Sequence, residues 1–197
     1  MNQKTAMKLF GLLGLLMLLS CGYADRHRNS SSCEQALVDS LEVRVQDSLF
    51  SNVHYSRSQL LEALTQTQDS LVYYRLLALY GKTFFVSSDF DSILYYNRRV
   101  KEFSRNASQS SESLQSPRWN DVLSDVYNIE GNVWMQLNRP DSAIIDYKKA
   151  YGYRLEGKKL HLLPDICINI ADAYLHRSDL AHTASYYRRA LFLCDSL

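Results

Sequence analysis

The sequence predicts an all-α protein, a row of antiparallel helix pairs that follows a cleaved N-terminal export signal. Hydrophobic residues make up 46% of the 197 residues, which is enough to bury a core. Only seven Gly and three Pro leave few residues for the tight turns that an all-β protein needs. Residue types also recur in a fixed register, which indicates an internal repeat.

The N-terminus predicts export and lipid attachment. Two lysines precede an apolar run from Leu9 to Leu19, which is the layout of a secretory signal. This run is shorter than the ~20 apolar residues that a membrane-spanning helix needs. The Leu-Leu-Ser sequence directly before Cys21 resembles the lipobox of bacterial lipoproteins, which implies cleavage after residue 20 and acylation of Cys21. We therefore expect residues 1–20 to be a lipoprotein signal peptide. The alternative is an ordinary cleaved signal with a chance cysteine.

Two further segments separate the signal from the repeats. Residues 21–32 are polar and without an apolar period, so we expect a flexible tether between the membrane and the folded domain. Residues 33–68 have helical periodicity over 34–50 and 56–68. We expect them to form leading helices, either a degenerate repeat or a cap, for an array over residues 69–197.

The array contains three copies of one pattern, each centred on a small residue. The small residues are Gly81, Gly131 and Ala171, with an aromatic residue three positions later at Phe84, Trp134 and Tyr174. Twelve positions after the small residue stand Ile93, Ala143 and Thr183, and nineteen positions after it stand Val100, Ala150 and Ala190. Sixteen positions after it stand Asn97, Tyr147 and Tyr187, so the first copy lacks the large ring. Small residues where two helices approach and aromatic residues where a gap must be filled are what an antiparallel helix pair requires.

These copies resemble the tetratricopeptide-repeat (TPR) family. The closest copy is YNIEGNVWMQLNRPDSAIIDYKKA, from Tyr127 to Ala150, followed by INIADAYLHRSDLAHTASYYRRA, from Ile168 to Ala190. The likeness covers Tyr73 to about Leu193, and its style resembles TPR lipoproteins and TPR sensor regions of Bacteroides-like bacteria. It implies an α-solenoid of three repeats. The departures from the family pattern are Asn97, Glu130 and Thr183.

The copies lie 50 and 40 residues apart, whereas the family's repeat has ~34 residues, so connections must hold the extra residues. The Ser-rich stretch from Asn106 to Pro117 is one of them, and the stretch from Gly157 to Pro164 is the other. We expect first helices over 70–87, 119–137 and 164–177, and second helices over 91–105, 141–156 and 180–194.

The resemblance implies a binding surface on the concave face, lined mainly by first-helix residues. By register these are Arg75, Lys82, Val86, Asp125, Asn128, Asn132, Gln136, Asp165, Ile168, Asn169, Asp172 and His176. Amides are frequent among them, and an amide pairs well with the backbone of a bound peptide because it both donates and accepts. The alternative for each residue is a solvated polar surface. A clamp for a C-terminal carboxylate is not favoured, because Ala78 and Asn128 stand where such clamps have a lysine.

The composition argues against several other functions. A net charge of +1 does not favour nucleic acid as a partner. The sequence has no Gly-rich phosphate loop, no Gly-flanked nucleophilic serine and no HExxH, so we expect neither an enzyme nor a cofactor. Asp172 and His176 form the one i, i+4 pair of interest among five scattered histidines, and a surface contact is favoured over a metal site. Pairs of adjacent basic residues stand at equivalent positions of the second helices. They form either a basic stripe across the array or the solvated outer face of each helix.

The third copy is expected to leave apolar surface uncovered, because no helix in the sequence follows it. Together its residues supply more apolar surface than one neighbouring pair covers, so part of it should be bare: Ile166, Ile170, Tyr174, Tyr186, Leu191 and Leu193. Self-association through this end, or a further helix in a longer chain, would cover them. We therefore expect an envelope-anchored TPR lipoprotein, facing the periplasm or the cell surface, that binds a protein or peptide in its groove. The alternative is the extracytoplasmic sensory region of a longer signalling protein.

Overall fold

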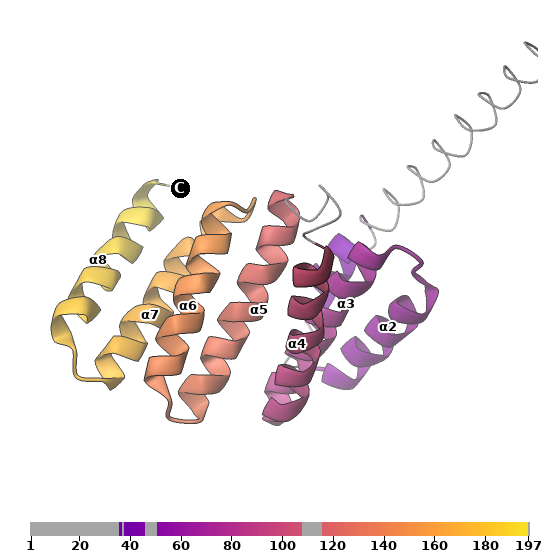
Figure 1. Ribbon diagram of the computed structural model, residues 1–197, viewed down its shortest axis with the longest axis horizontal. Helices are drawn as coiled ribbons and strands as arrows, with labels where there is room; N and C mark the ends of the chain where they lie inside the picture. The colour runs from indigo at the N-terminus through magenta and orange to yellow at the C-terminus, as the bar shows by residue number, and fades with distance from the viewer. Residues whose placement is uncertain (1–35, 37, 46–50, 108–115, 197) are drawn as a thin grey trace, which may run out of the picture.

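The computed structural model describes residues 36, 38–45, 51–107 and 116–196, and every regular element in these ranges is a helix (Figure 1). The all-α prediction is thus confirmed for the described part of the chain. The elements after the helical segment 38–45 are α2 (Val53–Gln66), α3 (Ser70–Lys82), η1 (Thr83–Ser87), α4 (Phe90–Ala107), α5 (Pro117–Gln136), α6 (Pro140–Leu155), η3 (Leu160–Leu162), α7 (Leu163–His176) and α8 (Leu180–Ser196). The expected signal peptide, its Cys21 and the tether lie outside the described residues.

The six expected repeat helices begin and end within two residues of those observed, with one change of helix type. The segment expected as a single helix over 70–87 is α-helical only to Lys82 and continues as the 3₁₀ helix η1. The upstream helix starts earlier than the expected residue 56, because the Asn52 side chain caps α2 by accepting from the Tyr55 amide at 3.1 Å.

Local chemistry fixes where the helices start. Asp69 caps α3 by accepting from the amides of Leu71 and Val72 at 2.8 and 3.2 Å. The three prolines of the sequence all stand in the first turn of a helix, where the missing N–H costs no hydrogen bond. They are Pro117 in α5, Pro140 in α6 and Pro164 in α7.

The same turn joins the two helices of each pair. Its central residue is in the left-handed region at Ser88, Asn138 and Ser178, with φ of 53°, 56° and 61°. The next amide donates back to the carbonyl of the repeat aromatic, at 3.2 Å for Phe84, 2.8 Å for Trp134 and 3.0 Å for Tyr174. This is the Schellman arrangement, which usually has glycine at its left-handed position. Three copies of one turn, at the spacing of the sequence register, make α3–α4, α5–α6 and α7–α8 equivalent pairs.

Small residues let the helices of a pair approach closely. A Cβ atom on Gly131 would lie 2.3 Å from the ring of Tyr147, so the ring packs directly on the α5 backbone. Ala143, Ala150 and Ala171 are fully buried. Thr183, at the position of Ala143, is accommodated because its hydroxyl donates to the Asp179 carbonyl at 2.8 Å.

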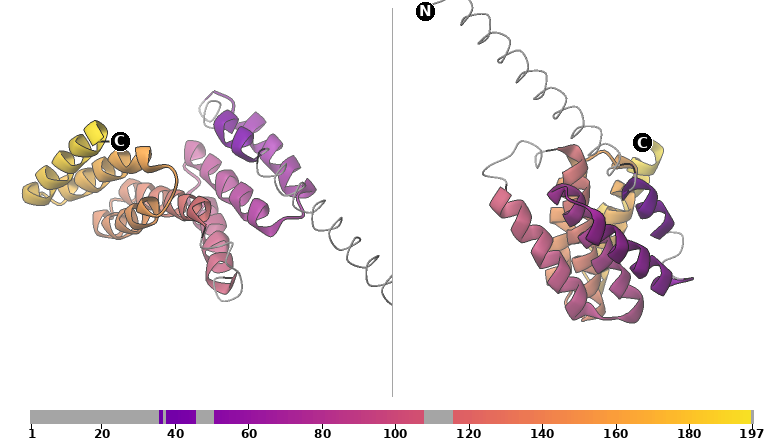
Figure 2. Two further views of the ribbon diagram at one scale, coloured as in Figure 1. Left: turned by 90° about the horizontal axis from the view of Figure 1, so that it is seen from above. Right: turned by 90° about the vertical axis from the view of Figure 1, so that its right-hand side faces the viewer.

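The pairs stand side by side in a curved row (Figures 1 and 2). At one end, Val38, Leu41 and Val45 pack against α2 and α3. In the middle, Ile166 and Ile170 of α7 share a core with Tyr147 of α6. Within the described ranges, no helix combines the length and apolar character that crossing a membrane requires.

Candidate functional site

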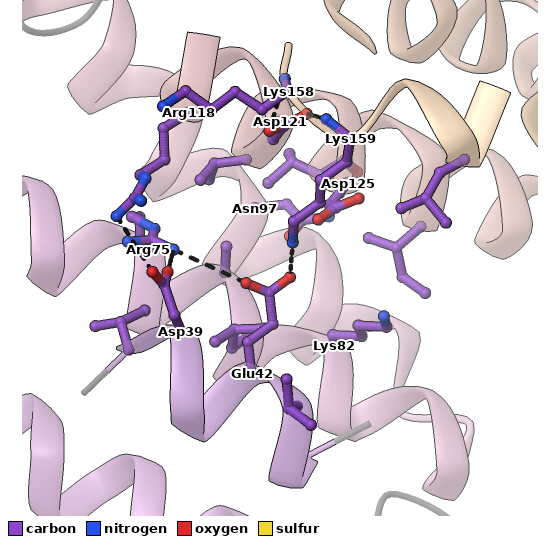
Figure 3. Close-up of a pocket in the computed structure, with 18 of the residues that line it drawn as sticks. Asp39, Glu42, Arg75, Lys82, Asn97, Arg118, Asp121, Asp125, Lys158 and Lys159 are labelled. Carbon is purple, nitrogen blue, oxygen red and sulfur yellow. Dashed lines mark hydrogen bonds and ion pairs between the residues drawn. The ribbon is translucent and has the colours of Figure 1, made fainter. Parts of the chain in front are cut away.

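A cavity of about 390 Å³ opens among the first helices of the row (Figure 3). Its walls come from the helical segment 38–45, from α3, from α5 and from the connection between α6 and α7. These parts are distant in sequence, and the curvature of the row brings them together (Figure 2). The volume lies in the range of pockets that hold small molecules or peptide side chains.

Three of the predicted groove residues line this cavity, namely Arg75, Lys82 and Asp125. The other predicted polar residues do not line it. Among these, Asn128 accepts from the Asn169 side chain at 3.0 Å, Asn132 accepts from the Tyr147 hydroxyl at 2.7 Å, and Asp172 accepts from the Tyr187 hydroxyl. Gln136, Asp165 and His176 are exposed, as are the apolar Val86 and Ile168. Several groups expected to meet a partner are therefore used in contacts within the protein.

Arg75 is buried at 5% exposure and needs compensating acids, because an unpaired buried guanidinium would be costly. It lies 2.7 Å from Asp39 and 3.8 Å from Glu42 in the helical segment 38–45. Arg118 also lies 3.3 Å from Asp39, and Lys159 pairs with Glu42 (Figure 3). These ion pairs tie α3, α5 and the α6–α7 connection to the leading segment.

Asp121 holds the α6–α7 connection in place. Its buried carboxylate lies 2.8 Å from the Arg154 guanidinium and accepts from the amides of Lys158 and Lys159 at 3.0 and 3.2 Å. A Cβ atom on Gly157 would lie only 2.2 Å from Asp121 Oδ1. Glycine is therefore required here because the carboxylate approaches the backbone.

The acids that line the cavity are all in ion pairs, since Arg154 also contacts Asp125. Two of the lining cations are not. Among the described residues, neither Lys82 nor the Lys158 ammonium has an ion pair, and Figure 3 shows both without a dashed contact from the side-chain nitrogen. The cavity thus presents two uncompensated positive charges.

Asn97 of α4 also lines the cavity and is fully buried. Its Nδ2 donates to the Val126 carbonyl at 3.2 Å, whereas no described residue donates to its Oδ1. Nearby, burial raises the pKa of the Glu130 carboxyl, and its hydrogen bond from Lys101, at 2.7 Å, opposes this shift. Asn97 and Glu130, which both depart from the repeat pattern, therefore lie in one polar contact between α4 and α5.

Sequence reasoning did not identify Asp39, Glu42 or Lys158 as site residues. The two acids lie in the leading segment, whose sequence pattern is weak. The adjacent Lys158 and Lys159 of the α6–α7 connection are the one sequence feature that could have indicated this site. In the residues that the structure describes, no three His, Cys, Asp or Glu side chains group as metal ligands.

Comparison of the chain with protein-family models and with curated protein sequences gives no match.

Proposed function

We propose that this protein is a TPR-type α-solenoid that binds a protein or peptide partner on its concave face. The observation that carries the proposal is the cavity, which lies between α3 and α5, the first helices of two successive pairs, and is closed by the helical segment 38–45 and the α6–α7 connection. The three equivalent turns support the repeat assignment, because each has its left-handed residue at the same offset from the small residue of its copy.

The chemistry of the cavity favours binding over catalysis. Its walls include the aliphatic residues Leu79, Val122 and Ile129, its acids are neutralised, and its remaining charges are two lysines. Such a surface can bury an apolar group and attract an acidic one, which are the two elements of peptide recognition. We therefore propose a binding protein rather than an enzyme or a cofactor carrier.

The proposal places this module at a bacterial envelope, attached by lipid on Cys21. The support is the order of charge, apolar run and lipobox-like sequence at the N-terminus. A lipid anchor would hold the groove near a membrane surface, where an envelope partner is at high effective concentration.

Crosslinking in envelope preparations tests the binding function. A double charge reversal, Lys82→Glu with Lys158→Glu, should abolish crosslinks that the wild-type chain forms. The matched control is Arg98→Glu with Arg188→Glu, which makes the same change of charge at two exposed second-helix positions. Crosslinks that survive the cavity variant, or that are equally lost in the control, would contradict the proposal.

Self-association through the C-terminal pair is a second proposal, supported by exposure at equivalent positions. Tyr151 of α6 is half-buried, with α7 packed alongside, whereas its counterpart Leu191 of α8 is 67% exposed. Phe192 and Leu180 are also bare, at 70% and 68%. Ile166, Ile170 and Tyr174, which the sequence placed among the uncovered residues, are instead buried in the core shared with α6. A second copy would cover this face, and so would a further helix in the alternative of a longer sensory protein. Sedimentation across a range of concentrations distinguishes these, because only the first predicts a dimer.

A further inference from the structure

A row of positive charge crosses the second helices of the three pairs. Arg98 of α4, Lys148 of α6 and Arg188 of α8 stand at the same position, seventeen residues after the small residue of each copy, and all three are exposed. Lys148 donates to the Tyr174 hydroxyl at 2.8 Å, and Arg188 Nε donates to the Ala184 carbonyl at 3.1 Å, so both acceptors are uncharged groups. In the described part of the chain, none of the three cations forms an ion pair.

The acids near this row do not neutralise it. On one helix, residues three or four positions apart share a face. Among the residues at these distances from the three cations, Glu102 of α4 is the one acid. Lys101 and Arg154 also belong to second helices, but they point toward the first helices and pair with Glu130 and Asp121. The outer row therefore keeps its positive charge, although the net charge of the whole chain is only +1.

Apolar side chains flank the row on the same face. Tyr95 of α4 and Ile145 of α6 stand three positions before the cations of their helices and are 54% and 57% exposed. Leu155 stands seven positions after the cation of α6, two turns along the same face, and is 51% exposed. A single exposed apolar residue is ordinary on a protein surface. Here it recurs at one repeat position beside a cation, which makes the outer face both basic and apolar.

This face points away from the cavity. Ile93 of α4 and Ala143 of α6 are fully buried in the cores that these helices share with the first helices, so the exposed residues lie on the other side. The second helices run along the outer side of the curved row (Figure 2). A partner in the cavity and a contact on this face would therefore not compete.

We propose that the outer face of the second helices binds an anionic lipid surface. The cations of the row meet the phosphate groups of the lipids, and Tyr95, Ile145 and Leu155 reach between the headgroups, as on helices that lie in a membrane interface. An acidic protein would satisfy the charges alone and would leave the two aliphatic side chains unexplained. The inference rests on the proposed envelope location, because the lipid on Cys21 would keep this face near a bilayer, and it leaves the groove open to the aqueous side.

Hydroxyl-radical footprinting of the full chain tests the proposal. Protein purified from envelopes is placed on vesicles of phosphatidylcholine and on vesicles that also contain phosphatidylglycerol, so that attachment of the N-terminus is the same in both. Tyr95 should be modified about threefold more slowly on the anionic vesicles, because the bilayer shields its ring. Tyr55 of α2, at 51% exposure, is the internal control and should be modified at one rate on both lipids. Equal rates for Tyr95 on the two lipids would overturn the proposal.

Two charge-reversal variants test the assigned surface. Arg98→Glu with Arg188→Glu reverses two of the three charges and should remove the protection of Tyr95. Lys82→Glu with Lys158→Glu makes the same change of charge in the cavity and should keep the protection. Circular dichroism spectra that match the wild type show that both variants are folded. Protection that survives in the outer-face variant, or is lost in both variants, would refute the assigned surface.

The same two variants separate this inference from the proposed binding function. Envelope crosslinks should be lost in the cavity variant and kept in the outer-face variant, which retains its anchor. If crosslinks follow this pattern but Tyr95 is modified equally on both lipids, the groove binds a partner and the lipid contact is wrong. If Tyr95 is protected on anionic lipid but no crosslink depends on the cavity lysines, the lipid contact holds and the proposed function fails. Crosslinks lost only in the outer-face variant, without lipid protection of Tyr95, would assign an acidic protein to this face and overturn the proposal.

Discussion

Replacing Gly131 by alanine tests the closest approach between α5 and α6. The new methyl group would lie 2.3 to 2.9 Å from three ring atoms of Tyr147, well inside van der Waals contact. The ring has little freedom to move, because it is 2% exposed and its hydroxyl is bonded to Asn132. Overpacking of this kind costs about 1 to 3 kcal/mol, and the better helix propensity of alanine returns up to about 1 kcal/mol. We expect a net loss of up to about 2 kcal/mol.

The matched control is the same substitution at Gly152, in the last turn of α6. A Cβ atom there meets nothing within 4 Å, so only the propensity gain remains. Gly152→Ala should therefore stabilise the protein by about 0.5 to 1 kcal/mol. The two substitutions are chemically identical and should shift the urea midpoint in opposite directions.

A double-mutant cycle identifies Tyr147 as the cause. Tyr147→Ala alone should cost about 3 to 5 kcal/mol because it leaves a cavity. In that background the clash is gone, so Gly131→Ala should become stabilising. If Gly131→Ala has the same effect with and without the ring, or matches Gly152→Ala in sign, the packing described between α5 and α6 is wrong.

Three further predictions concern other parts of the chain. Burial raises the folded-state pKa of Glu130 above its ordinary 4.5, so stability should fall as pH rises from 4.5 through the folded pKa, and urea unfolding of Glu130→Gln should lack that fall. Cys21→Ser should abolish fatty acid labelling of the exported protein, and labelling that persists would exclude Cys21 as the lipid site. Amide exchange should be faster over Ile166–Leu193 than over Tyr127–Ala150 in dilute protein and should slow with concentration, whereas equal protection in a monomer would exclude association through α8.

The helices were predictable because their signals are local. A small residue, an aromatic three positions later and a proline or Asp near each helix start are visible within about twenty residues of sequence. The turns were harder to predict from the sequence. Ser88, Asn138 and Ser178 adopt a conformation that glycine usually provides, and only their common offset from the small residues could have indicated it.

The site was only partly predictable, because its contacts join residues far apart in the chain. First-helix register places Arg75, Lys82 and Asp125 on one face, and all three line the cavity. It could not show that Arg75 is neutralised by Asp39, since that pairing depends on how the leading segment packs. Nor could it show that Asn128 and Asn169 bond to each other across two helices, which removes both from the set of free amides.

Two of the departures from the repeat pattern, Asn97 and Glu130, are linked to each other at the junction between the first and second pairs. Between the second and third pairs, the ring of Tyr147 shares a core with Ile170. At the equivalent positions between the first and second pairs stand Asn97 and Glu130, and Lys101 supplies the charge that a buried carboxylate needs. A ring at Asn97 alone would lie against a carboxylate, and an aliphatic residue at Glu130 alone would leave Lys101 without its acid. The polar pair therefore holds this junction together without a ring at position 97, and Tyr96 and Asn97 fill the place over Gly81 that Tyr147 takes over Gly131 in the next pair.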